Sequence, residues 1–192
     1  MVLGSLQNEL RTLAPRNPRN PWNPYTSRMA FLDALLPEFD HEMATTRRVL
    51  ERVPEPQFGW RPHDKSFSLG DLTGHISNIP FWCTMTLKDT SLDLATLDRP
   101  KSPTSLAEVL KGFDNRVTTA REHLARATDP EFLVPWTLKM GDQEFFTMPR
   151  ISVLRTFVMN HLIHHRGQLT VYLRLNDVPL PPIYGPTADE QP

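Results

Sequence analysis

Three histidines fall within five positions of the segment NHLIHHRGQL, residues 160–169. His161 and His165 are four residues apart, so on an α-helix both side chains leave the same face about one turn apart and can reach a single ion. His164 points to the margin of that face, and we do not expect it to join them. Zinc and similar metals take three or more protein ligands. The pair is therefore either an ordinary structural pair satisfied by hydrogen bonds or part of a site completed elsewhere in the chain.

The element that carries the pair is predicted to be a long helix over residues 150–175. At about 100° per residue, one stripe of this helix contains Leu154, Phe157, Val158, His161, His165, Gln168 and Tyr172. The stripe is mostly apolar, so it is expected to face the core, with the histidine pair in its middle. Two neutral imidazoles without partners would be costly there. A ligand or a third histidine is expected to face them.

A second predicted helix, residues 69–87, supplies that third histidine. It opens at Ser68 and Asp71, where the serine oxygen accepts a free backbone N–H and the acid faces the positive helix end. His75 shares a face of this helix with Leu72, Ile79, Trp82 and Thr86. Asp71 lies one turn before His75 and could hold its ring N–H, although the capping role is favoured. The expected ligand set is therefore His75, His161 and His165.

Three nitrogen ligands with one position left open are the pattern of a catalytic zinc site. Structural zinc sites are normally closed by a fourth ligand and are rich in cysteine, whereas this chain has a single cysteine, Cys83, expected to be a small buried hydrophobe. The open position would hold water or a substrate heteroatom such as a thiolate. Zinc, nickel, iron and manganese are all compatible with the sequence.

Two further helices complete the predicted fold. The first covers about residues 28–53, with an apolar stripe spaced by three and four. The other opens with the capping box Ser105 to Glu108 and continues through Leu124. Residues 128–149 break the helical period and predict a short hairpin or extended loop. The fold class is therefore all-α, a four-helix bundle, and bundles commonly build metal sites from facing helices.

The N-terminal residues differ from the rest. Proline recurs every third residue from Pro15 to Pro24, which is the period of polyproline II and is incompatible with helix or central strand. We expect residues 1–28 to be a disordered extension and residues 29–192 to form the bundle domain.

Composition limits the partners. The net charge is −1 with 22% charged residues, so no basic footprint for nucleic acid exists. No apolar run reaches the length of a membrane span, and no secretory signal opens the chain. With one cysteine and no internal disulfide, the expected location is the cytoplasm, and the expected partner is a small molecule.

Four segments together carry a family resemblance: Trp60-Arg-Pro62, SLGDLTGHI with His75, NHLIHHRGQL, and VPLPPIYGPTADE at the end. Over about residues 30–188 the chain resembles the DinB/YfiT-like superfamily of four-helix bundles. The resemblance implies a divalent metal held by His75, His161 and His165, and frequent homodimers. Characterised relatives include bacillithiol-dependent S-transferases and a mycothiol-dependent isomerase, while many members have no assigned reaction.

The expected function is that of a divalent-metal-dependent enzyme, acting as a thiol S-transferase on an electrophilic small molecule, with a low-molecular-weight thiol as cosubstrate. Activation of water for hydrolysis is a weaker possibility within the same class. Trp82, Gln168 and Tyr172 are predicted to line the substrate pocket. The alternative is a non-catalytic bundle that binds a metal or a stress ligand.

Residues around the histidine pair receive structural roles. Arg166 is expected to be a surface or dimer-interface charge, Gly167 to allow close approach of another helix, and Tyr184 to return to the pocket mouth. The opposite side of the last helix is also apolar, with Met159, Leu162, Ile163 and Leu173. This helix either packs against a second subunit or is the central helix of the monomer.

Overall fold

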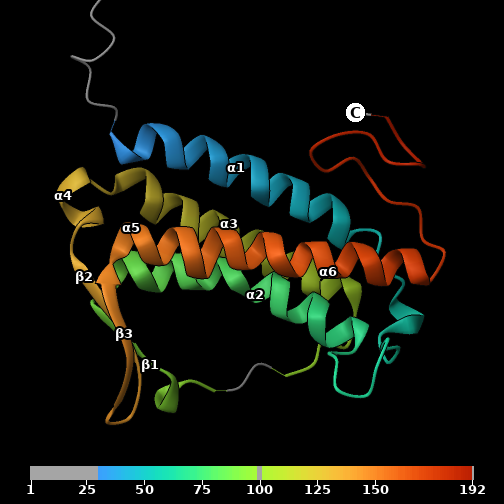
Figure 1. The fold of residues 1–192 in the computed structure, drawn as a ribbon, viewed down its shortest axis with the longest axis horizontal. Helices are drawn as coiled ribbons and strands as arrows, with labels where there is room; N and C mark the ends of the chain where they lie inside the picture. Colours follow the sequence, from blue (N-terminus) through green and yellow to red (C-terminus); the bar gives the residue numbers. More distant parts are fainter. Residues whose placement is uncertain (1–29, 99–100, 192) are drawn as a thin grey trace, which may run out of the picture.

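Four long helical segments form a bundle in the computed structural model, which describes residues 30–98 and 101–191 (Figure 1). They are α1 (Phe31–Leu50), α2 (Leu69–Lys88), α3 (Leu106–Arg126) and a last segment made of α5 (Arg150–Val153), a π-helical stretch (Leu154–Asn160) and α6 (His161–Leu175). Short helical turns also occur at Glu55–Gln57, at Leu94–Thr96 (η3) and in α4 (Asp129–Phe132). The predicted all-α four-helix bundle is confirmed. The predicted extension, residues 1–28, lies outside the described residues.

Helices α2 and α3 begin where the capping residues predicted. The Ser68 hydroxyl oxygen accepts from the Asp71 backbone N–H at 3.1 Å, and the Ser105 hydroxyl oxygen accepts from the Glu108 N–H at 3.2 Å. The Asp71 carboxylate accepts from the Ser102 hydroxyl at 2.6 Å and from the Ser68 hydroxyl at 2.7 Å, and these two bonds lower its pKa. Asp71 therefore has the favoured capping role. It also ties the start of α2 to the loop before α3.

The predicted hairpin is β2 (Pro135–Met140) paired antiparallel with β3 (Gln143–Pro149). Gly141 occupies its turn with φ of +58°, a conformation that glycine adopts without strain. A third strand, β1 (Ser91–Asp93), pairs parallel with β2 and was not predicted, because three residues are too few for a period-two pattern. Trp136 and Leu138 of β2 pack with Leu92 and Val153 into a small core of their own.

The last helical segment was predicted as continuous α-helix, but its middle is π-helical over Leu154–Asn160. A π-helix closes its hydrogen bonds over five residues rather than four, so it contains more residues per turn. The wide turns end at Asn160, directly before His161, the first residue of α6. Such segments are frequent at functional sites.

The most buried side chains of α6 do not lie on the predicted histidine stripe. They are Leu162, Arg166, Leu169 and Leu173, whereas His161 and His165 are half-buried. The reason is that α6 packs against both α1 and α2 and is the central helix of the monomer (Figure 1). Its second apolar side is therefore covered within the chain and gives no reason to expect a dimer, which stays a prediction.

Arg166 was predicted to lie at the surface, and this is wrong. Its side chain is 2% exposed, and its guanidinium lies 2.6 Å from a carboxylate oxygen of Glu42 on α1. It also donates to the Tyr184 hydroxyl at 2.6 Å and to Thr46 at 3.2 Å. The Tyr184 hydroxyl in turn donates to Glu42 at 2.9 Å. We call Glu42, Arg166 and Tyr184 the arginine cluster.

Tyr184 therefore joins α1 to the C-terminal segment and does not reach the histidines, contrary to the expectation. Gly167 also has a different environment from the predicted one, because a Cβ added there would meet nothing within 4 Å. It does not allow a close helix approach.

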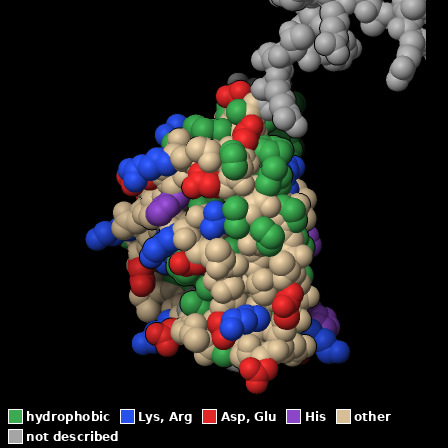
Figure 2. Space-filling view, turned by 90° about the vertical axis from the view of Figure 1, so that its left-hand side faces the viewer, with side chains coloured by type: hydrophobic (Ala, Val, Ile, Leu, Met, Phe, Trp, Pro, Cys, Tyr) green, Lys and Arg blue, Asp and Glu red, His purple; other side chains and the backbone are tan. Residues whose placement is uncertain are grey.

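The end of the bundle at which α4 lies carries interspersed basic and acidic side chains around a group of hydrophobic ones (Figure 2). Exposed Phe31 and Leu133 belong to the elements at this end. Within the described residues, no helix has both the length and the apolar character needed to cross a bilayer.

Candidate metal centre

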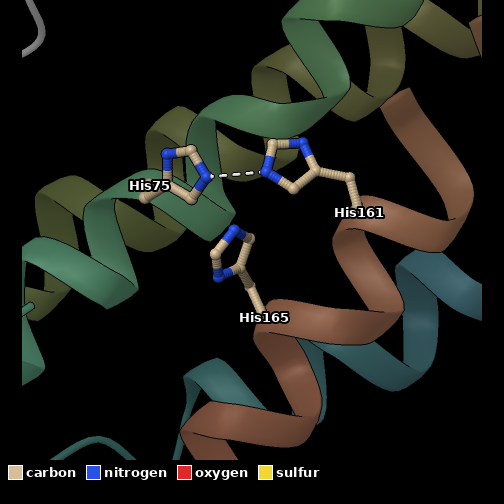
Figure 3. A group of neighbouring side chains, drawn as sticks. All are labelled: His75, His161 and His165. Atoms are coloured by element: carbon tan, nitrogen blue, oxygen red, sulfur yellow. Dashed lines mark hydrogen bonds between the residues drawn. The ribbon is translucent and has the colours of Figure 1, made fainter. Parts of the chain in front are cut away.

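The side chains of His75, His161 and His165 point toward one another in the space between α2 and α6 (Figure 3). One ligand nitrogen from each ring lies within 4.8 Å of the other two. The Nε2 atoms of His75 and His161 are 3.1 Å apart, and the ring centroids are separated by 4.5 to 5.0 Å. Residues 86 positions apart in the chain are thus brought together as the sequence predicted.

These separations fit a metal ion. Two nitrogens bound to one tetrahedral ion at about 2.05 Å lie roughly 3.3 Å apart, close to the 3.1 Å between His75 and His161. The hydrogen bond between these Nε2 atoms needs one proton, and a cation between them would replace it. In the part of the chain that the structure describes, no fourth His, Cys, Asp or Glu joins this group. The set is therefore three neutral nitrogens, which is the protein contribution to an open zinc-type site.

The π-helical stretch orients His161. Its Nδ1 lies 3.3 Å from the carbonyl oxygen of Phe157, one turn earlier. The backbone N–H of His161 bonds to Val158 rather than to Phe157, which leaves the Phe157 carbonyl available to the ring. A proton on Nδ1 leaves the lone pair on Nε2, the atom that faces His75.

Gln168 orients His165 in the same way. The Nδ1 atom of His165 lies 2.7 Å from the side-chain oxygen of Gln168, one turn later, so Nδ1–H donates and Nε2 keeps its lone pair. Gln168 is exposed. It was predicted as a pocket residue, and the structure places it behind a histidine, where it fixes the tautomer of that ring.

The environment favours the neutral form of all three rings. Burial and, to a smaller extent, the neighbouring His165 and His161 lower the pKa of His75 from its usual 6.5 to about 4. Burial also lowers the pKa values of His161 and His165, against smaller opposing effects of the hydrogen bonds to Phe157 and Gln168. Because metals bind neutral imidazole, the rings are ready ligands at neutral pH.

Phe67 covers the histidines on their outer side and was missed by the sequence analysis. Its ring stacks on His75 at 5.7 Å between centroids and lies 6.4 Å from His165, while 49% of the residue remains exposed. Tyr172, a predicted pocket residue, donates its hydroxyl to the Phe67 carbonyl at 3.3 Å and packs edge-on against Trp60. A lone aromatic residue before a helix cap has no periodicity, so only its position next to Ser68 could have drawn attention to it.

A cavity of about 940 Å³ adjoins His75, and Trp82 is in its wall. A smaller cavity of about 310 Å³ lies on another side of His75, bounded by Phe67, Asp71 and the loop with Pro103. Helix α2 comes close to that loop at Gly74, where a Cβ would lie 3.0 Å from Pro103. Of the three predicted pocket residues, Trp82 lines the large cavity, Tyr172 supports Phe67, and Gln168 faces solvent beside His165. His164 is exposed and outside the ligand set.

The comparisons with known proteins agree with this architecture. The family model of the DinB superfamily matches residues 38–169, which include all three histidines. An uncharacterised protein of Bacillus subtilis (strain 168), YrdA, is 26% identical over 160 residues, covering 83% of this chain and 91% of that protein.

Solved structures are similar over most of the chain. A DinB-like protein from Bacillus cereus ATCC 10987 superposes with a TM-score of 0.63 at 26% identity, covering 81% of this chain and 98% of its own. The DinB-like protein YjoA of Bacillus subtilis gives a TM-score of 0.62 at 17% identity, covering 78% of this chain and 96% of its own. At that lower identity the likeness concerns the fold alone.

Proposed function

Because the chain belongs to the DinB superfamily, we propose that it is a divalent-metal-dependent enzyme whose metal is held by His75, His161 and His165. The observation that carries the proposal is the convergence of three neutral imidazoles, with ligand nitrogens within 4.8 Å of one another, beside a large cavity. Zinc, nickel, iron and manganese are the candidate ions.

A divalent cation in such a site supplies Lewis acidity, which lowers the pKa of a thiol or of water and holds the resulting anion in place. The residues of the chain would orient the metal ligands and limit the access of water. His161 and His165 are held by Phe157 and Gln168 with Nε2 inward, and Phe67 shields the outer side from water.

The reaction we propose is transfer of a low-molecular-weight thiol to an electrophilic small molecule. The thiol loses its proton, its sulfur forms a bond to the electrophilic carbon, and the leaving group departs with the electron pair of the broken bond. The single cysteine supports an external thiol, because Cys83 is fully buried and burial raises its pKa to about 12. A buried protonated thiol is a poor nucleophile.

The second candidate is a non-catalytic bundle that binds a metal or a stress ligand. It is favoured by one observation: within the described residues, no acid or base other than the histidines belongs to the ligand cluster. Both candidates share the metal centre and differ in turnover.

Metal analysis tests the shared part. Purified wild-type protein is expected to hold about one divalent ion per chain, and His75→Ala, His161→Ala and His165→Ala are each expected to lose most of it. His164→Ala is the matched control, because His164 is adjacent to His165 but exposed and outside the cluster. Full metal retention in each of the three variants would rule out the centre.

Turnover is tested with monochlorobimane and a panel of thiols: bacillithiol, mycothiol, glutathione and cysteine. The transferase predicts a fluorescent conjugate that forms faster with wild-type protein than with His161→Ala, and that rate is expected to fall on metal removal. Absence of metal-dependent conjugation with every thiol favours the binding function.

A further inference from the structure

The 940 Å³ cavity beside His75 has a mixed lining of apolar groups and a few polar ones, among which, in the described part of the chain, Arg116 is the one arginine or lysine and Asn78 and Asp98 are the others besides His75. Its walls include His75 and Trp82 of α2, Leu94 and Leu97 in and after η3, Met140 of β2, and Arg116 of α3. Ligand-binding cavities usually combine an apolar wall with a few polar groups that fix orientation. The arrangement therefore has the composition of a small-molecule site, and its polar end is Arg116.

Arg116 lacks the partner that a half-buried arginine normally has. Its Nη1 donates to the Ser77 hydroxyl at 3.2 Å and to the Ser77 carbonyl at 3.4 Å. Within the described residues it forms no ion pair with a carboxylate. Burial lowers its pKa, and no neighbouring acid raises it. Asp98 also lines the cavity, but it is exposed.

Gly112 sets the position of the guanidinium. It precedes Arg116 by one turn of α3, and a Cβ added there would lie 2.7 Å from Nη1. The guanidinium can therefore lie against the α3 backbone beside Ser77, which keeps it at the cavity wall. Removing a charge from water without a counter-charge is costly, and a bound anion would offset that cost.

We propose that this cavity binds an organic anion with an apolar body, its acid group on Arg116 and its body against Trp82, Leu94 and Leu97. Because Arg116 and His75 line the same cavity, a ligand held on Arg116 shares its space with the metal centre. This inference rests on the proposed function and specifies it, because it makes the substrate of the metal centre an amphipathic small-molecule acid.

The test uses two fluorescent probes that differ in one group. 8-Anilinonaphthalene-1-sulfonate carries an acid group, and N-phenyl-1-naphthylamine is the same ring system without it. Both are titrated into metal-stripped wild-type protein and into Arg116→Gln. A charge-assisted hydrogen bond contributes enough for about a tenfold loss of sulfonate affinity in Arg116→Gln, while affinity for the neutral probe is expected to change less than about twofold.

Matched variants locate the effect. Arg121→Gln removes an arginine of the same helix that is paired with Asp40 at the surface, and it is expected to leave both affinities unchanged. Gly112→Ala is expected to weaken sulfonate binding alone, by displacing the guanidinium. Leu97→Trp is expected to weaken both probes by filling the cavity.

The inference is overturned if Arg116→Gln leaves sulfonate affinity unchanged or weakens both probes equally. Metal content, measured on the same proteins as purified and before the metal is stripped, separates this outcome from failure of the proposed function. Retained metal with no selective loss in Arg116→Gln rejects the anion site alone. If Arg116→Gln weakens only the sulfonate affinity in a His161→Ala protein that holds no metal, the anion site is supported independently of the metal centre.

Discussion

Adjacent residues of α6, His165 and Arg166, leave the helix about 100° apart and enter polar clusters of different kinds, one facing α2 and the other facing α1. The arginine cluster is closed: Arg166 pairs with Glu42, Tyr184 bonds to both, and Thr46 accepts from the guanidinium. The histidine cluster is not closed in this way. The Nδ1 atoms of His161 and His165 are satisfied by Phe157 and Gln168, but the Nε2 atoms of His75 and His161 face each other. A polar cluster whose opposite charges pair with each other serves stability, whereas one that directs lone pairs at a common point is suited to an ion.

The largest expected effect is on the closed side. Glu42→Ala leaves Arg166 buried without its counter-charge, so we expect a loss of about 3 to 5 kcal/mol in the free energy of unfolding, measured by urea denaturation of metal-free protein. The double variant Glu42→Leu with Arg166→Met is expected to be far closer to wild type, because it removes both charges together. A small loss in Glu42→Ala would contradict the assignment of the cluster to stability.

The next effect concerns metal and stability together. Zn²⁺ at about 100 times its Kd is expected to raise the free energy of unfolding of the wild type by about 2.7 kcal/mol. His161→Ala is expected to show little of this gain, while Glu42→Leu with Arg166→Met keeps it. Thermal or urea unfolding with and without Zn²⁺ measures the difference. An equal gain in His161→Ala would place the ion elsewhere.

A smaller effect is expected behind the histidines. Gln168→Leu removes the oxygen that holds Nδ1 of His165, and loss of such a support typically weakens metal affinity about 10- to 100-fold. Competition with a chromophoric chelator gives the affinity. Thr170→Val is the control, because the Thr170 hydroxyl donates to the Gly167 carbonyl within α6 and Thr170 is outside the histidine cluster. Equal affinities in Gln168→Leu and wild type would exclude the supporting role.

The smallest effect is a pH dependence of the metal-free protein. His75 has a folded-state pKa near 4 against 6.5 when unfolded, so between these values the unfolded chain binds more protons. Its contribution to stability is complete above pH 6.5 and is lost as pH falls toward 4. Urea unfolding from pH 7.5 to 4.5 is expected to show a shallower decline in His75→Ala than in wild type. Parallel curves would show that His75 does not titrate as described.

The convergence of the three histidines was predictable because it follows from helical periodicity. His161 and His165 share a helix face because they are four residues apart. His75 shares a face with Trp82 on a helix whose first residue is identified by the N-cap Ser68. The N-cap serines and the hairpin turn are equally local signals, and the structure confirms them.

The errors concern residues whose environment depends on distant parts of the chain. Arg166 was assigned to the surface because its partners, Glu42 and Tyr184, lie 124 and 18 residues away, and nothing near it in sequence identifies them. Arg116 gave no signal either, since its importance comes from a cavity formed by α2, α3 and η3. The π-helical stretch was missed because its composition is that of an ordinary amphipathic helix.

The π-helical stretch determines the rotation of α6 about its own axis, and hence the direction in which each side chain of α6 points. Each residue of a regular α-helix advances the chain by about 100° around the helix axis. The π-helical stretch has more residues per turn, so each of its residues advances the chain by a smaller angle. Restoring α-geometry over Leu154–Asn160 while keeping every residue would turn α6 by roughly 100° relative to the bundle. The imidazoles would then swing away from His75, and Arg166 away from Glu42. The extra residue of the π-helical stretch thus sets the one rotation of α6 at which both its histidine face and its arginine face meet their partners.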